Sequence, residues 1–130
     1  MSQLINYFET PELSEFYFED SYVLTIEETP TLLSFEIDAV LTEKHHEYTS
    51  PHKGEQHCYK KTLLSFLDAE AHEWSSKKFI AFSDNSGEFD YGNIDLFTTD
   101  NDNYLLSGDW GQVTIRGGTQ KITPLSNSTI

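Results

Sequence analysis

A strict two-residue alternation over residues 33–41 constrains the fold of this chain more than any other feature. Apolar side chains at every second position are separated by mostly polar ones: Leu33, Phe35, Ile37, Ala39 and Leu41, with Ser34, Glu36, Asp38 and Val40 between them. Successive side chains of a strand point to opposite faces, so this period predicts one buried face and one that contacts solvent. The pattern is typical of a strand in an antiparallel sheet.

Other short segments rich in β-branched and aromatic residues share this period. Strands are expected at residues 23–26, 33–41, 58–67, 91–98, 104–107, 112–116 and 119–123, with Trp74 and the run 79–82 continuing the core. About seven strands separated by regular turn signals indicate an antiparallel β-sandwich or a partly closed barrel. We therefore expect a mainly β protein.

One short N-terminal helix is predicted before the first strand. Thr10 is a suitable N-cap, Pro11 fits the first helical position, and Glu12 would lie near the positive end of the helix dipole. Leu13 and Phe16 would then share the buried face.

Turn residues divide the rest of the chain. Residues 43–54 form a polar connection long enough to protrude, and residues 100–103 are expected to join two strands of a hairpin. Gly108 and Gly111 enclose Asp109 and Trp110, which predicts a bulge or corner. The pair at 117–118 suits a two-residue hairpin turn.

Length and cysteine content favour one intracellular domain. A chain of 130 residues is close to the commonest domain size, so residues 1–125 are expected to form a single β domain and residues 126–130 a flexible tail. The single Cys58 has no partner for an intramolecular disulfide, which favours a reducing compartment. The first residues lack a basic leader and no apolar stretch is long enough to span a bilayer, so we expect a cytoplasmic protein.

The charge is strongly one-sided. Eight Lys and Arg face 22 Asp and Glu, which gives a formal net charge of −14. A field of that sign repels phosphate backbones and anionic lipids, so nucleic acid and membranes are not expected partners. The charge either provides solubility alone or attracts a basic protein partner.

Histidines are concentrated in one segment. His45, His46, His52 and His57 fall within thirteen residues, beside Cys58. Imidazole and thiolate are good zinc ligands, but the spacing matches no closed zinc pattern. The alternative is a solvated loop that responds to pH, and we expect neither a metal ion nor another cofactor.

Acidic and aromatic residues in the second half are the candidate partner-binding residues: Asp84, Glu88, Asp90, Tyr91, Asp95, Asp109 and Trp110. Residues 84–95 resemble a calcium loop, but an EF-hand needs Gly and Glu where Phe89 and Asp95 stand. Aromatic residues at strand spacing also pack in cores. No residues form a recognisable nucleophile–base set, so no catalytic residue is assigned.

Several motifs carry a resemblance. Residues 18–24, 39–41, 54–59, 87–95 and 108–111 resemble a family of small uncharacterised bacterial β-rich domains of unknown function, loosely similar to immunity proteins that neutralise toxins. The resemblance spans most of the chain, and it implies no established activity and no catalytic residue that could be transferred to this chain.

Two kinds of function remain open besides a metal-dependent module that uses the histidine loop. The first is a non-enzymatic acidic protein-binding module, with an immunity-type inhibitor of a basic partner as one form; a homodimer through a sheet edge is compatible with it. The second is a small-ligand-binding or hydrolytic β-barrel protein that uses carboxylates at one end.

Overall fold

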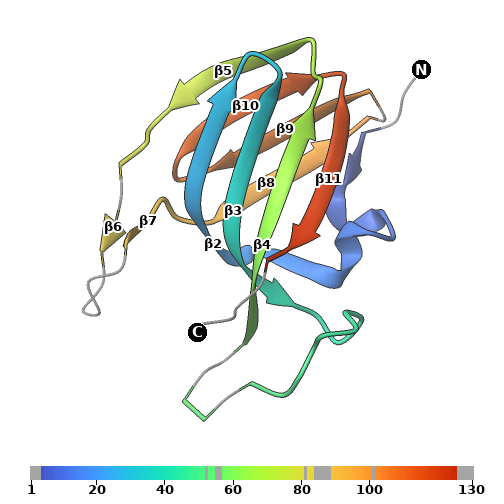
Figure 1. Ribbon diagram of the computed structural model, residues 1–130, viewed down its shortest axis with the longest axis vertical. Coiled ribbons are helices and arrows are strands. Elements are labelled where there is room, and N and C mark those ends of the chain that lie inside the picture. Colours follow the sequence, from blue (N-terminus) through green and yellow to red (C-terminus); the bar gives the residue numbers. More distant parts are fainter. Residues whose placement is uncertain are drawn as a thin grey trace.

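Two antiparallel sheets pack face to face. The computed structural model describes residues 4–51, 53–54, 57–80, 82–83, 89–100 and 102–125, so the tail expected at 126–130 lies outside the described residues. One sheet has the strand order β1-β8-β9-β10-β5, the other β11-β4-β3-β2, and β6 pairs only with β7. Figure 1 shows the two layers. The strands are β1 Ile5–Asn6, β2 Phe16–Thr29, β3 Leu32–Leu41, β4 Cys58–Leu67, β5 Ala71–Lys77, β6 Phe82–Ser83, β7 Phe89–Asp90, β8 Ile94–Thr99, β9 Asn103–Gly108, β10 Gly111–Arg116 and β11 Thr119–Pro124.

The alternating strand predicted at residues 33–41 is confirmed as β3, at the centre of the four-stranded sheet. Its alternate apolar side chains are all buried: Leu33, Phe35, Ile37, Ala39 and Leu41. On β4, Leu64 lies opposite Phe35 and is also fully buried. Because β3 and β4 each have a neighbour on both sides, their backbone groups are paired along both edges.

The five-stranded sheet supplies the other half of the core. Phe97, Leu106, Val113 and Ile115 are at most 1% exposed, and Trp110 packs against Phe35 with ring centroids 5.0 Å apart. Side chains from both sheets therefore fill the space between them. The mainly β class is confirmed, and the two separate sheets do not close into a barrel.

Two of the crossings between the sheets lie at neighbouring corners. Residues 68–70 lead from β4 to β5, and Gly117 and Gly118 lead from β10 to β11. The hairpin predicted at 117–118 is wrong, because β11 pairs with β4 instead of with β10. Gly118 has φ +84, and a Cβ there would lie 2.6 Å from the carbonyl oxygen of Leu67. The glycine pair thus serves a sheet crossing where two backbones touch.

The predicted N-terminal helix is also wrong. Two short 3-10 turns, η1 Tyr7–Glu9 and η2 Leu13–Glu15, take its place, and Thr10 follows the first of them with an extended backbone. The described residues contain no α-helix. Leu13 is buried as expected, but Phe16 is already extended because it and Phe18 enter the core from β2. Burial of that strand ends the helical turn.

Two further local predictions need correction. Phe79 and Ile80 do not continue the core, because β5 ends at Lys77 and both side chains are exposed, whereas Ala81 lies outside the described residues. Gly108 and Gly111 pair with each other across a tight turn, so this segment is a hairpin between β9 and β10. The bulges lie in the outer pairings of this hairpin, with register shifts between Gln112 and Val113 opposite β5 and between Ile94 and Leu96 opposite β9.

Candidate functional site

A bulge in β2 forms the floor of a cleft. Tyr17 pairs with Val40 and Tyr22 pairs with Asp38, so residues 18–21 face one residue of β3. Ser21 fills the gap: its hydroxyl donates to the carbonyl of Tyr17 (2.7 Å) and accepts from the amide of Val40 (2.8 Å). A bulge bends its strand and redirects side chains. Here it leaves Asp20 exposed beside the start of β4.

The connection between β3 and β4 forms the wall of the cleft. The amide of Thr42 donates to the carbonyl of Glu15, and His45 packs edge-on against Phe16 with ring centroids 5.2 Å apart. His45 Nδ1 accepts the amide of Glu47 at 3.0 Å. Burial lowers the pKa of His45, so the neutral ring that can accept this bond is favoured. The buried histidine therefore fixes the loop on the sheet.

The Tyr17 cleft has a volume of about 420 Å³. Its lining comes from β2, β3, the loop and the first residues of β4: Tyr17, Asp20, Val40, Leu41, Thr42, Glu43, Tyr48, Pro51, His57 and Cys58. Two tyrosines, aliphatic side chains and two carboxylates thus share one concave surface. A cleft of this composition offers apolar contact together with a few polar groups that orient a ligand.

Aromatic rings extend the cleft along the outer face of the sheet. Tyr22 and Tyr59 stack with centroids 6.4 Å apart, and His57 meets Tyr59 edge-on at 6.0 Å. Tyr17 and Tyr22 are each 45% exposed. Exposed tyrosines at this density are typical of protein-contact surfaces.

One carboxylate of the cleft already has a side-chain partner. Asp20 Oδ2 lies 3.2 Å from His57 Nε2, and the Cys58 thiol lies 3.7 Å from the hydroxyl of Thr49. His57, just before β4, and Cys58, its first residue, therefore have different partners, and they form no thiol–imidazole pair with each other. The arrangement suits binding of a cation better than covalent chemistry.

Acidic residues predominate in the strands that form the floor of the Tyr17 cleft, whereas four lysines lie in the connection and in early β4: Lys44, Lys53, Lys60 and Lys61. Residues 1–43 contain ten Asp and Glu and no Lys or Arg. This stretch includes all of β2 and β3, which supply the floor. The carboxylates that line the cleft itself, Asp20 and Glu43, are the groups that favour a cation there.

No family model, curated protein or solved structure matches the chain. The resemblance to immunity-type domains accordingly stays a prediction. No helix in the described part of the chain is long and apolar enough to cross a membrane.

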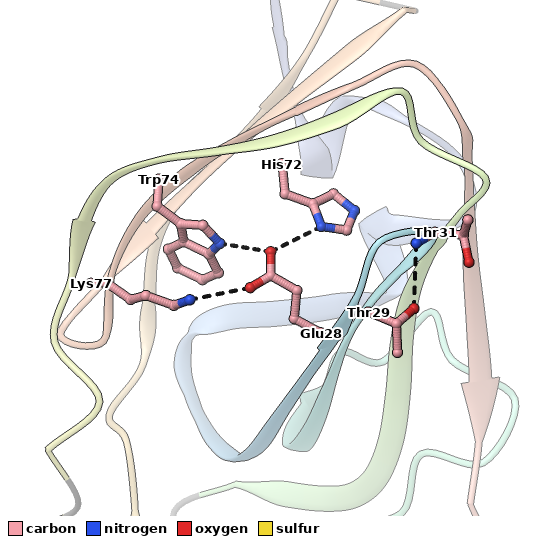
Figure 2. A network of polar contacts seen from close by, with 6 residues as sticks. All are labelled: Glu28, Thr29, Thr31, His72, Trp74 and Lys77. Atoms are coloured by element: carbon pink, nitrogen blue, oxygen red, sulfur yellow. Dashed lines mark hydrogen bonds and ion pairs between the residues drawn. The ribbon is translucent and has the colours of Figure 1, made fainter.

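A second polar cluster joins the edge strands of the two sheets. Glu28, near the end of β2, receives hydrogen bonds from two side chains of β5, Trp74 Nε1 and His72 Nδ1, each at 2.9 Å. The ammonium of Lys77 lies 3.2 Å from the other carboxylate oxygen. Figure 2 shows the three side chains converging on Glu28, with the turn at Thr29 and Thr31 beside them.

These contacts keep Glu28 ionised. Burial alone would raise its pKa, but the hydrogen bonds from Trp74, Lys77 and His72 outweigh burial and lower it. The other ring nitrogen of His72 is buried without a hydrogen-bond partner among the described residues. A shallow pocket of about 390 Å³ lies alongside, lined by Glu28, Thr29, Pro30 and His72.

The acidic candidates predicted from the sequence have mixed positions. Asp84 and Glu88 lie outside the described residues. Asp90 accepts the amide of Gly92 at 2.8 Å, and Asp95 accepts the side-chain amide of Asn93 at 3.0 Å. Both carboxylates thus stabilise the segment that leads into β8.

The remaining candidates lie near the same segment but differ in exposure. The exposed Asp109 packs against Gly92 in the turn between β9 and β10. Tyr91 is half-buried, and its amide donates to the carbonyl of Val23. Trp110 is a core residue with no exposed surface, and its indole donates to the carbonyl of Asn93 at 3.0 Å. Trp110 is therefore not available to a partner in this conformation.

The histidine segment is only partly described. His45 and His46 stack in a turn with centroids 4.7 Å apart, His57 pairs with Asp20, and His52 lies outside the described residues. Among the described residues, no group of three or more His, Cys, Asp or Glu side chains is arranged to hold a metal ion.

Tyr17, Asp20 and Glu43 were missed as site residues by sequence reasoning. The sequence does not signal the bulge, because apolar residues stand at even positions on both sides of it, at Phe16, Phe18, Leu24 and Ile26. Only the folded chain shows that burial changes from even positions to the odd position of Val23, which requires extra residues between the two halves of the strand. The loop that closes over the bulge has no signal in the sequence either.

Proposed function

We propose that this protein is a non-enzymatic, acidic protein-binding module that takes a basic segment of a partner protein in the Tyr17 cleft. The observation that carries the proposal is the combination of Tyr17 and Tyr48 with the carboxylates of Asp20 and Glu43 on one concave surface. Arginine suits this combination, because its planar guanidinium stacks on aromatic rings and pairs with carboxylates.

The overall charge supports the same kind of partner. A net charge of −14 accelerates encounter with a basic protein, whereas the local carboxylates determine where the partner binds. Inhibition of a basic, toxin-like protein is the specific form that the sequence resemblance implies. A cleft that masks arginine or lysine side chains of such a partner would be sufficient for inhibition.

The alternative of a ligand-binding or hydrolytic barrel has less support. The two sheets enclose packed side chains, so the barrel mouth on which that hypothesis relied is not formed. Asp90 and Asp95 each accept a local hydrogen bond in the segment before β8. We propose no hydrolytic role for them.

Fluorescence anisotropy with a labelled peptide of three arginines separated by glycines tests the proposal. The double variant Asp20→Asn/Glu43→Gln is compared with Asp95→Asn/Asp102→Asn, so that both proteins lose two negative charges. Removing a carboxylate that contacts the peptide weakens binding sharply. A carboxylate farther than about 8–10 Å from the peptide is screened by salt and contributes little. We expect at least tenfold weaker binding for the cleft variant and less than twofold for the control.

Two results would overturn this assignment. Equal losses in both variants would mean that the peptide responds only to diffuse negative charge. A larger loss in Asp95→Asn/Asp102→Asn would place binding on the β8–β9 side of the molecule instead. Circular dichroism of each variant verifies that the sandwich is intact.

A further inference from the structure

The ammonium group of Lys77 lies inside an incomplete aromatic cage. Its Nζ is 5.0 Å from the ring centroid of Trp74 and 5.4 Å from that of Phe79. The carboxylate of Glu28 completes the surroundings at 3.2 Å. Figure 2 shows the Lys77 side chain running past the Trp74 ring toward Glu28. Two ring faces and one carboxylate are the groups that proteins use to bind organic cations.

The walls of this cage are held independently of Lys77. Trp74 donates to Glu28 and meets the buried Trp110 edge-on, with centroids 6.0 Å apart. Phe79 contacts Trp74 at 5.4 Å and Tyr91 at 6.0 Å. Because neighbouring groups already position the rings and the carboxylate, the cage does not need its present occupant to keep its shape.

The occupant is about half exposed and lies at the end of a strand. The Lys77 side chain is 49% exposed and ends β5, and Phe79 beside it is 40% exposed. Contacts of an ammonium group at such a position are weak, since solvent screens them and the long side chain has many conformations. A cation from another molecule can therefore compete with Lys77.

We propose that Glu28, Trp74 and Phe79 form a binding site for an alkylammonium group of another molecule, and that Lys77 occupies this site until the ligand displaces it. The chemical class covers a lysine side chain, a methylated lysine and a free quaternary ammonium such as choline. The proposal does not rest on the Tyr17 cleft, because no residue of the cage lines that cleft.

Primary and quaternary ammonium groups would make different contacts in this cage. A primary ammonium donates hydrogen bonds, so it would use both the rings and Glu28, as Lys77 does now. A quaternary ammonium has no N–H group and would rely on the ring faces and on charge alone. Replacing Glu28 by Gln should therefore weaken a lysine ligand more than a quaternary one.

The experiment removes the internal occupant. The variant Lys77→Ala and the wild-type protein are titrated with a short lysine peptide, with the same peptide carrying trimethyllysine, and with choline chloride. A norleucine peptide, which has the same chain without the charge, is the control. The readout is the indole N–H signal of Trp74 in nitrogen-15 NMR spectra; the signal of Trp110, the second tryptophan, reports that the core is intact.

We expect Lys77→Ala to bind at least one of the cationic ligands tenfold more tightly than the wild type, and this binding should shift the Trp74 signal. The norleucine peptide should not shift that signal. Adding Glu28→Gln to Lys77→Ala should weaken lysine binding at least fivefold while the Trp110 signal stays in place. If Lys77→Ala binds none of the cations more tightly than the wild type, Lys77 is a structural contact and the proposal fails. Binding of norleucine as tight as that of lysine would also contradict it.

Discussion

At the scale of single residues, Glu28 shows how one carboxylate connects two sheets. It lies near the end of an edge strand in one sheet and receives hydrogen bonds from His72, Trp74 and Lys77 in the edge strand of the other. The adjacent Glu27 is exposed and lies on the other side of the strand. The sequence shows two neighbouring glutamates, and only the position of β5 distinguishes their roles.

Replacing Glu28 by Gln should lower the free energy of unfolding by about 1–2 kcal/mol at pH 7, because hydrogen bonds to a charged group are lost. The folded protein lowers the pKa of Glu28, so the ionised carboxylate stabilises the fold above the ordinary pKa of 4.5. That stabilisation disappears as the pH falls through the lowered pKa. Urea unfolding at pH 7 and at pH 3 measures both effects.

Glu27→Gln is the matched control for that prediction, and we expect it to change the unfolding free energy by less than about 0.5 kcal/mol at either pH. The difference between Glu28→Gln and the wild type should shrink at pH 3. An equal loss at both pH values would show that the charge of Glu28 does not stabilise the fold.

At the scale of elements, local patterns located the strands better than they located the partners of those strands. The alternation in β3 predicted its buried face, because that information lies in consecutive residues. The glycine pair at 117–118 predicted a reversal of the chain, but a turn between strands of one sheet and a crossing between sheets need similar residues. Pairing of β11 with β4, about fifty residues away, decides between them.

The crossing gives a prediction about two adjacent glycines. Gly118→Ala should destabilise the protein by about 2–4 kcal/mol, since it combines a strained φ of +84 with a Cβ 2.6 Å from the carbonyl oxygen of Leu67. Gly117→Ala should cost only about 1–2 kcal/mol, because its φ is also positive but its Cβ would meet nothing closer than 3.6 Å. Thermal and urea unfolding of the two variants measure the difference; equal destabilisation would contradict the close approach.

At the scale of the whole molecule, the acidic segments do not all gather on one face. The turn that contains Asp102 contacts Gly117 at the end where β4 finishes, whereas the 43–54 connection precedes the start of β4. Figure 1 shows these two connections at opposite ends of the sandwich. Net charge and composition are read directly from the sequence. The mainly β class was predictable because it depends on patterns along the chain as a whole. The Tyr17 cleft was not, because it requires the β2 bulge and the loop to meet.

Nuclear magnetic resonance mapping of a basic ligand tests the central claim most directly. The nitrogen-15-labelled protein is titrated with the arginine peptide, and the shift of every backbone amide is followed. The proposed function predicts saturable shifts concentrated at the amides of Tyr17, Asp20, Glu43 and His57, with affinity that falls as salt rises. Small, non-saturating shifts distributed over acidic residues of both sheets, or saturable shifts at a different surface, would contradict binding in the Tyr17 cleft.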